Sequence, residues 1–118
     1  MKSDDRVLKF VDQTLRHYGR AFGLRVRRVR PMPEKLSAES VYGQCFSSGT
    51  IYITIRWPKP DGRAVLAYAL VDTMAHELAH LRHPDHGSCW FRLYALIFYA
   101  MADDGVFDKL SKLVKRRP

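Results

Sequence analysis

Apolar side chains recur every three or four residues in the first part of the chain, which is the spacing of one face of an α-helix. The members of this stripe are Val7, Leu8, Val11, Leu15 and Tyr18. Asp4 or Asp5 can cap the free N–H groups at the start of such a helix, and Gly19 or Gly23 can end it. We therefore expect a first helix that runs to about Tyr18.

The next part of the chain has the alternation and the turn residues of short strands. Residues 24–29 alternate apolar and arginine side chains, which predicts a strand. Residues 41–46 and 50–57 predict two more strands, and the turn residues Ser47, Ser48 and Gly49 between them indicate a hairpin. Residues 58–62 have the composition of a further turn, because two prolines and a glycine lie among them.

Helical patterning returns after this turn. Residues 63–75 are rich in Ala, Leu, Val and Tyr and contain no Gly or Pro, which favours a buried helix. If that helix continues, one side of its wheel is apolar and the opposite side carries His76 and His80. The apolar side consists of Ala67, Val71, Met74, Leu78 and Leu81. Residues 90–102 predict a second apolar helix, and residues 106–114 a short last one.

Helices at both ends of the chain and strands between them predict the α+β fold class. We expect a small, mostly antiparallel three-stranded sheet packed on helices. The 118 residues leave room for one hydrophobic core, so we expect a single domain over residues 1–118. An apolar content of 47% is typical of a folded chain rather than a disordered one.

The motif that carries chemistry is His-Glu-x-x-His at residues 76–80. Two histidines four residues apart on a helix lie on the same face, so His76 and His80 can bind one ion. Glu77 follows the first histidine, where its carboxylate can take a proton from water activated at the metal. The motif therefore predicts a metal site with Glu77 as the catalytic base.

A third histidine completes the predicted site. Pro84 disfavours helix in the residue before it, and Gly87 permits a tight turn, so the chain between them can swing His86 back toward the metal. Three protein ligands with a vacant fourth position are typical of catalytic zinc. We predict one Zn²⁺ ion held by His76, His80 and His86. Three further polar residues can orient these ligands from outside: His83, Asp72 and Asp85.

Residues 76–91 resemble the SprT-like and YgjP-like group of small zincin metallopeptidases. The YgjP-like pattern has a histidine midway between the second and third ligands, as His83 stands here. The SprT-like pattern ends in His-Gly-x-x-Trp, which is matched by His86, Gly87 and Trp90. The resemblance implies a zincin-like fold and a zinc-dependent metallopeptidase, with the same three histidine ligands and Glu77 as the general base.

The resemblance also implies how a protein or peptide substrate binds. In these families an exposed strand beside the active-site helix pairs with extended substrate through backbone hydrogen bonds. Residues 42–45 and 51–54 look like the hairpin that precedes the helix. We assign the substrate strand to residues 50–56, with Thr50, Tyr52 and Thr54 as its contact residues.

Two other functions remain open. A metal-dependent endoribonuclease of the YbeY type has a similar histidine run, with a leucine like Leu81 and an Asp-His pair like Asp85 and His86. That family normally has glycine where this chain has Glu77, and the glutamate favours peptide hydrolysis. The second is a non-catalytic module, stabilised by zinc, that binds nucleic acid.

The charge balance bears on partners. The chain has 20 Lys and Arg against 12 Asp and Glu, a net charge of +8. The positive residues concentrate in residues 20–30 and 109–117. Such clusters attract nucleic acid through counterion release, and Trp57 and the tyrosines offer stacking surfaces for single strands. We expect non-specific DNA contact, against the simpler reading in which the charge only keeps the chain in solution.

The start of the chain, its apolar runs and its cysteines bear on the cellular location. The first residues lack the apolar run of a signal peptide, and no stretch reaches the ~20 apolar residues of a membrane span, so we expect no membrane contact. With Cys45 and Cys89 as the two cysteines, we expect a cytoplasmic location and free thiols. The sequence does not predict the oligomeric state or the identity of the substrate.

Overall fold

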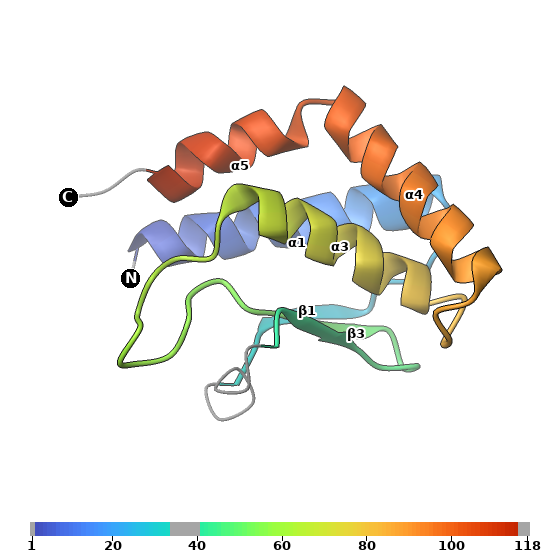
Figure 1. Ribbon diagram of the computed structural model, residues 1–118, viewed down its shortest axis with the longest axis horizontal. Helices are drawn as coiled ribbons and strands as arrows, with labels where there is room; N and C mark the ends of the chain where they lie inside the picture. Colours follow the sequence, from blue (N-terminus) through green and yellow to red (C-terminus); the bar gives the residue numbers. More distant parts are fainter. Residues whose placement is uncertain (1, 34–40, 116–118) are drawn as a thin grey trace.

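The computed structural model describes residues 2–33 and 41–115. In this part of the chain, helices lie on one face of a three-stranded sheet (Figure 1). The elements are α1 (Lys2–Ala21), β1 (Arg28–Pro31), β2 (Gly43–Cys45), β3 (Thr50–Ile53), α3 (Ala67–His80), α4 (Ser88–Asp103) and α5 (Val106–Lys115). Helices α1 and α3 pack on the sheet, and α4 and α5 pack on α3. The predicted α+β class is therefore confirmed.

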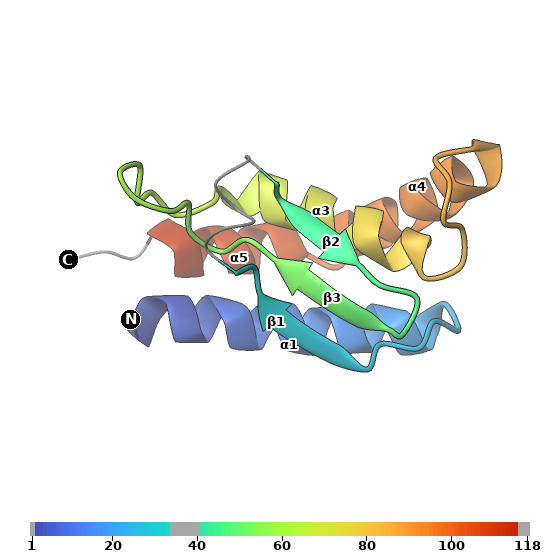
Figure 2. The same ribbon diagram turned by 90° about the horizontal axis from the view of Figure 1, so that it is seen from below.

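The sheet has the strand order β1-β3-β2 and is mixed. β2 and β3 form the expected antiparallel hairpin, in which Gly43 pairs with Ile53. β1 pairs with β3 in parallel, with Arg28 opposite Thr50. The expectation of a mostly antiparallel sheet was wrong, because β3 lies between the other two strands and returns in the direction of β1 (Figure 2). Alternation along the chain predicts strands, but it does not predict their order.

Two predicted boundaries were wrong for local reasons. The first strand begins at Arg28 rather than at residue 24, because the preceding segment is irregular up to Arg27, whose N–H bonds to the carbonyl of Gly49 at 2.8 Å. The helix predicted from residue 63 begins at Ala67. Residues 63–65 are instead extended and pair with residues 55–57, where Trp57 N–H donates to the carbonyl of Arg63 at 2.9 Å. The turn between these segments has Gly62 at φ 66°, which favours glycine.

The core is centred on α3. Its predicted apolar stripe is buried from Ala67 to Leu78, and Leu81 is half-buried at the end. Fully buried side chains from the surrounding elements pack around this stripe: Val11 and Leu15 of α1, Ile51 and Ile53 of β3, Ile97 and Met101 of α4, and Leu110 of α5. Because one side of α3 is held in this way, the opposite side, with His76 and His80, faces outward from the core.

β2 approaches α3 very closely at a glycine. A Cβ atom added to Gly43 would lie 2.6 Å from the Cγ2 atom of Thr73 and 3.3 Å from the Cγ atom of Glu77. A side chain at this position would therefore push the strand away from the helix. Among the described residues, no helix has the length and apolar character required to cross a membrane.

We predict that Gly43→Ala destabilises the fold, because overpacking forces β2 and α3 apart and costs about 1–3 kcal/mol. Urea unfolding of the two proteins measures the difference. Gly87→Ala is the matched control, since nothing lies within 4 Å of a Cβ atom there and its φ of −85° is open to alanine. A Gly43→Ala variant as stable as the parent would contradict the close approach.

Candidate metal centre

Three imidazoles converge at the C-terminal end of α3. His76 and His80 lie one turn apart on the helix, and His86 comes from the loop before α4. The Nε2 atom of His80 lies 3.1 Å from that of His76 and 2.9 Å from that of His86. The Nε2 atoms of His76 and His86 are 3.2 Å apart. The three predicted ligands thus face one another.

The loop after α3 explains how His86 reaches this position. The helix tightens at its end, where the N–H groups of Arg82 and His83 both bond to the carbonyl of Ala79. Pro84 follows and prevents the helix from continuing. The carbonyl of His83 then lies 3.0 Å from the Nδ1 atom of His80. A carbonyl only accepts hydrogen bonds, so Nδ1 of His80 carries the proton and its Nε2 lone pair points into the cluster.

This donor set fits a divalent metal ion. Three neutral imidazoles with their Nε2 atoms together make poor partners for one another, because each lone pair requires a cation or a donor. Zinc bound tetrahedrally at 2.0–2.1 Å spaces its ligand nitrogens about 3.3 Å apart, close to the separations seen here. Burial, followed by the neighbouring His80 and His86, lowers the pKa of His76, which keeps this ring neutral. The residue types suit zinc, and other divalent ions can also be held by three imidazoles.

Trp90 supports all three rings. Its side chain is buried at 8% exposure, and its ring centroid lies 4.8 Å from that of His76 and 4.7 Å from that of His86. It stacks on His80 at 5.4 Å with an interplanar angle of 30°. The indole N–H also donates to the backbone carbonyl of His76 at 3.3 Å. The rings are therefore held from behind by one rigid side chain, at the Trp of the His-Gly-x-x-Trp element.

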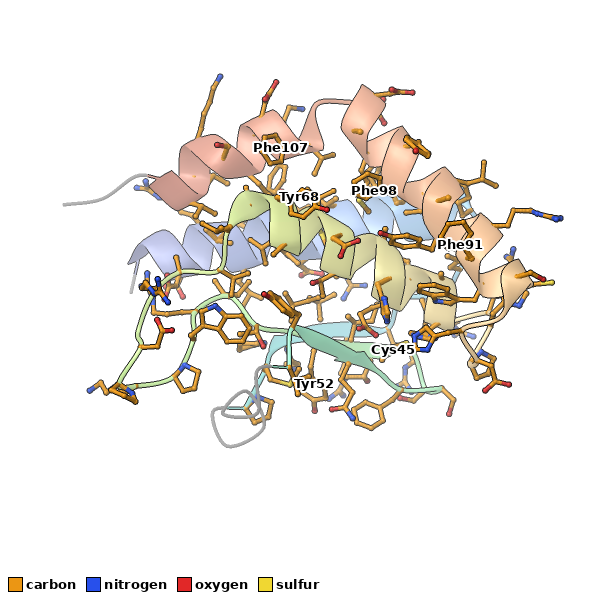
Figure 3. All side chains as sticks on the ribbon, viewed as in Figure 1. Cys45, Tyr52, Tyr68, Phe91, Phe98 and Phe107 are labelled. Carbon is orange, nitrogen blue, oxygen red and sulfur yellow. The ribbon has the colours of Figure 1, made fainter. Side chains whose placement is uncertain are left out.

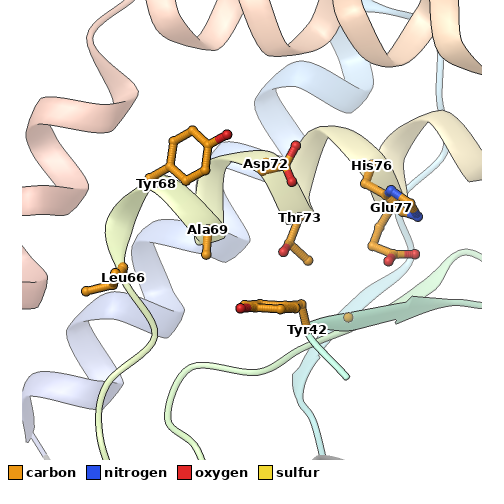
Figure 4. A pocket seen from close by; sticks show the side chains of 9 residues that line it. Tyr42, Leu66, Tyr68, Ala69, Asp72, Thr73, His76 and Glu77 are labelled. Atoms are coloured by element: carbon orange, nitrogen blue, oxygen red, sulfur yellow. The ribbon is translucent and has the colours of Figure 1, made fainter. Parts of the chain in front are cut away.

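Glu77 lies beside the cluster on the side that faces β2 (Figure 4). Its side chain is 5% exposed, yet it lines a groove that is open to solvent. Burial raises the pKa of Glu77 to about 7. A cation held by the adjacent imidazoles would lower this pKa again, because it favours the charged carboxylate. The protonation state of this carboxyl group therefore depends on whether the three imidazoles hold a cation.

The groove runs along α3 and passes the three histidines. One cavity of about 490 Å³ and another of about 370 Å³ meet at Gly43, His76 and Glu77. The larger cavity extends toward the start of α3 and has an apolar lining of Tyr42, Leu66, Tyr68 and Ala69 (Figure 4). The smaller extends along β2 past the other histidines and is lined by Cys45, Phe46, Ser47 and Pro84.

The three predicted orienting residues have different positions. Asp72 lines the groove one turn before His76 and accepts a hydrogen bond from the hydroxyl of Tyr94. Its charge opposes, without reversing, the lowering of the His76 pKa by burial and the neighbouring imidazoles. His83 contacts His80 through its backbone carbonyl rather than its ring. Asp85 is exposed, and among the described residues no hydrogen bond reaches its carboxylate. Asp72 is therefore the carboxylate that the structure brings to the site.

The predicted substrate strand does not have the open edge that substrate pairing requires. Thr50 and Tyr52 belong to β3, which is the central strand and is paired on both sides. Thr54 is buried and bonds through its N–H and its hydroxyl to the carbonyls of Tyr42 and Val41. Within residues 2–33 and 41–115, the strand with an open edge beside α3 is β2. The signal for it was Gly43, because a glycine within a strand indicates close approach of another backbone or side chain.

We predict that Trp90→Ala lowers the affinity for zinc by about 10- to 100-fold, because the supports of metal ligands have effects of this size. Trp90→Phe retains part of the ring contact and is expected to lose less. Competition with a chromogenic chelator measures the affinity, and circular dichroism verifies that the variants are folded. Phe91→Ala, on the exposed side of the same helix, is the control. Equal zinc affinities in the parent and the three variants would show that Trp90 does not hold the ligands.

Comparison with known proteins identifies a similar fold. No protein-family model matches the chain, and no curated protein is significantly similar to it in sequence. A crystal structure of a Wss1 mutant from Saccharomyces cerevisiae superposes with a TM-score of 0.69 at 12% sequence identity. The superposition covers 85% of this chain and 81% of the other. At this identity the likeness shows the fold alone, and it agrees with the α+β class that the sequence predicts.

Proposed function

We propose that this chain is a zinc-dependent metallopeptidase, in which His76, His80 and His86 hold the ion and Glu77 is the general base. The observation that carries the proposal is the position of Glu77 beside three convergent imidazoles, midway along a groove that has a strand edge as one wall. Metal-assisted peptide hydrolysis uses both elements, since the strand edge can hold the backbone in extended form and a metal ion can polarise the scissile carbonyl.

The free edge of β2 supplies backbone groups for an extended substrate. The carbonyl of Tyr42 and the N–H of Phe46 bond toward β3. Because bonding alternates along an antiparallel pair, Gly43 and Cys45 direct their N–H and C=O groups away from β3, toward the open edge. Such pairing tolerates many substrate side chains. The substrate strand of the proposal is therefore β2 in place of residues 50–56.

In the proposed hydrolysis, the metal ion and the protein residues have separate roles. Zinc, when bound, supplies Lewis acidity that polarises the scissile carbonyl and lowers the pKa of water. The Glu77 carboxylate accepts a proton from the attacking water and later donates it to the nitrogen of the leaving amine. The hydrogen bond from His80 to the carbonyl of His83 holds this ring in one tautomer throughout. Tyr94 fixes the Asp72 carboxylate at the groove wall one turn away.

Features of this chain's own residues favour this class of reaction over the two alternatives. Glu77 distinguishes the proposal from a YbeY-type endoribonuclease, which normally has glycine at this position. The open groove distinguishes it from a module in which zinc serves only the fold, since a structural site has four protein ligands and no access. Both alternatives are separated from the proposal by the experiments that follow.

We predict that Glu77→Gln abolishes cleavage of an unfolded protein such as casein, by 10²-fold or more, because general-base catalysis is worth about 10²–10⁴-fold. Zinc content is expected to stay that of the parent, since the variant retains all three imidazoles. Gel electrophoresis of casein digests measures the rate, and elemental analysis measures the metal. A zinc-loaded Glu77→Gln variant that cleaves as fast as the parent would exclude the mechanism. RNA hydrolysis by the parent would favour the endoribonuclease.

We predict about one zinc ion per chain and its loss in His86→Ala, because two imidazoles alone bind zinc weakly. His86 lies in an exposed loop, so the variant is expected to remain folded. His17→Ala is the matched control, since His17 is exposed on α1 and outside the cluster. A chelator should stop casein cleavage at concentrations that leave the far-ultraviolet spectrum unchanged. Unfolding on metal removal, with no prior cleavage, would favour a purely structural zinc.

A further inference from the structure

The face of the sheet that points away from the helices presents arginines and aromatic rings. In β1, Val29 is buried against the helices, so Arg28 and Arg30 point to the opposite face. In β3, Ile51 and Ile53 are buried in the same way, which directs Thr50 and Tyr52 outward. Figure 2 shows β1, β3 and β2 in front of the helices, and in Figure 3 Tyr52 points away from them. We call this surface the open sheet face.

The strand register arranges these residues in two rows. Arg30, Tyr52 and Gln44 lie side by side across the three strands. Arg28 lies beside Thr50, and Thr50 accepts a backbone hydrogen bond from Phe46 on the other side. The rings of Phe46 and Tyr52 meet edge to face with centroids 5.7 Å apart. Each row thus begins with a guanidinium group at β1. The aromatic pair consists of Phe46, directly after β2, and Tyr52 in β3.

Among the described residues, no carboxylate pairs with the arginines of this face. In the part of the chain that the structure describes, the ion pairs are those of Arg16, Arg56 and Arg63. Arg28 and Arg30 are exposed and take part in none of these ion pairs. The same holds for Arg25 and Arg27, in the segment that leads into β1. With a net charge of +8 over the chain, this face attracts a polyanion.

We propose that the open sheet face binds single-stranded nucleic acid. Guanidinium groups at β1 contact the phosphates, and the Phe46–Tyr52 pair offers ring surface to unpaired bases, which is the combination that single-strand binding requires. A duplex hides the faces of its bases and gains only the charge contacts. Phe46 is 44% exposed and also lines the peptide groove, so a bound strand would lie next to that groove. The inference stands on the sheet alone and does not depend on peptidase activity.

Fluorescence anisotropy with labelled oligothymidylate of about 15 nucleotides tests the proposal on the full chain, since single-strand sites of this kind span about 4–16 nucleotides. Arg28→Gln/Arg30→Gln is expected to weaken binding and to reduce the slope of log K against log salt by about 1.4, at about 0.7 for each lost phosphate contact. Arg6→Gln/Lys9→Gln, with the same charge change on exposed positions of α1, is the matched control and should retain nearly all affinity.

Replacing one ring tests stacking separately from charge. Tyr52→Thr and Phe46→Thr keep strand-forming residues on the face and are each expected to weaken oligothymidylate binding by about tenfold or more. Binding of a duplex of equal length should change little. The proposal is overturned if the α1 control loses as much affinity as the β1 variant, if the duplex binds as tightly as the single strand, or if neither threonine variant weakens binding.

Discussion

Burial of one side of α3 is the constraint on which the site depends. The stripe from Ala67 to Leu78 is held between α1, the sheet and the two last helices, so the helix cannot rotate without exposing it. His76 and His80 are thereby fixed on the outward side, with their rings one turn apart. A metal site built on a helix held in this way needs little rearrangement to bind its ion, because two of its three ligands are already oriented.

The second constraint is the contact between β2 and α3. Gly43 allows the strand to approach Thr73 and Glu77, and this approach makes the carboxyl group of Glu77 both buried and adjacent to a free strand edge. Burial raises the pKa of Glu77, and the strand edge defines where a peptide backbone can lie. One glycine thus links the raised pKa of Glu77 to the geometry of the groove.

Much of the site could be predicted from the sequence because its spacing is short-range. The His-Glu-x-x-His motif and the Pro84–Gly87 interval act within one helix and one loop, where local rules are strong. The fold class followed from the periodicity, and the helices were predicted to within a few residues except at the start of α3. Strand order could not be predicted, because it depends on contacts between β1 and β3 that are distant in sequence. For the same reason the substrate strand was assigned to β3, although the open edge belongs to β2.

The groove and the open sheet face lie on either side of β2, and Phe46 borders both. The central claim, however, concerns the cluster, and locating the ion in a zinc-loaded crystal by anomalous scattering at the zinc edge tests it most directly. The account predicts one ion at about 2.0–2.1 Å from the Nε2 atoms of His76, His80 and His86, with a vacant position toward Glu77. An ion bound elsewhere, or closed off by a fourth protein ligand, would contradict it.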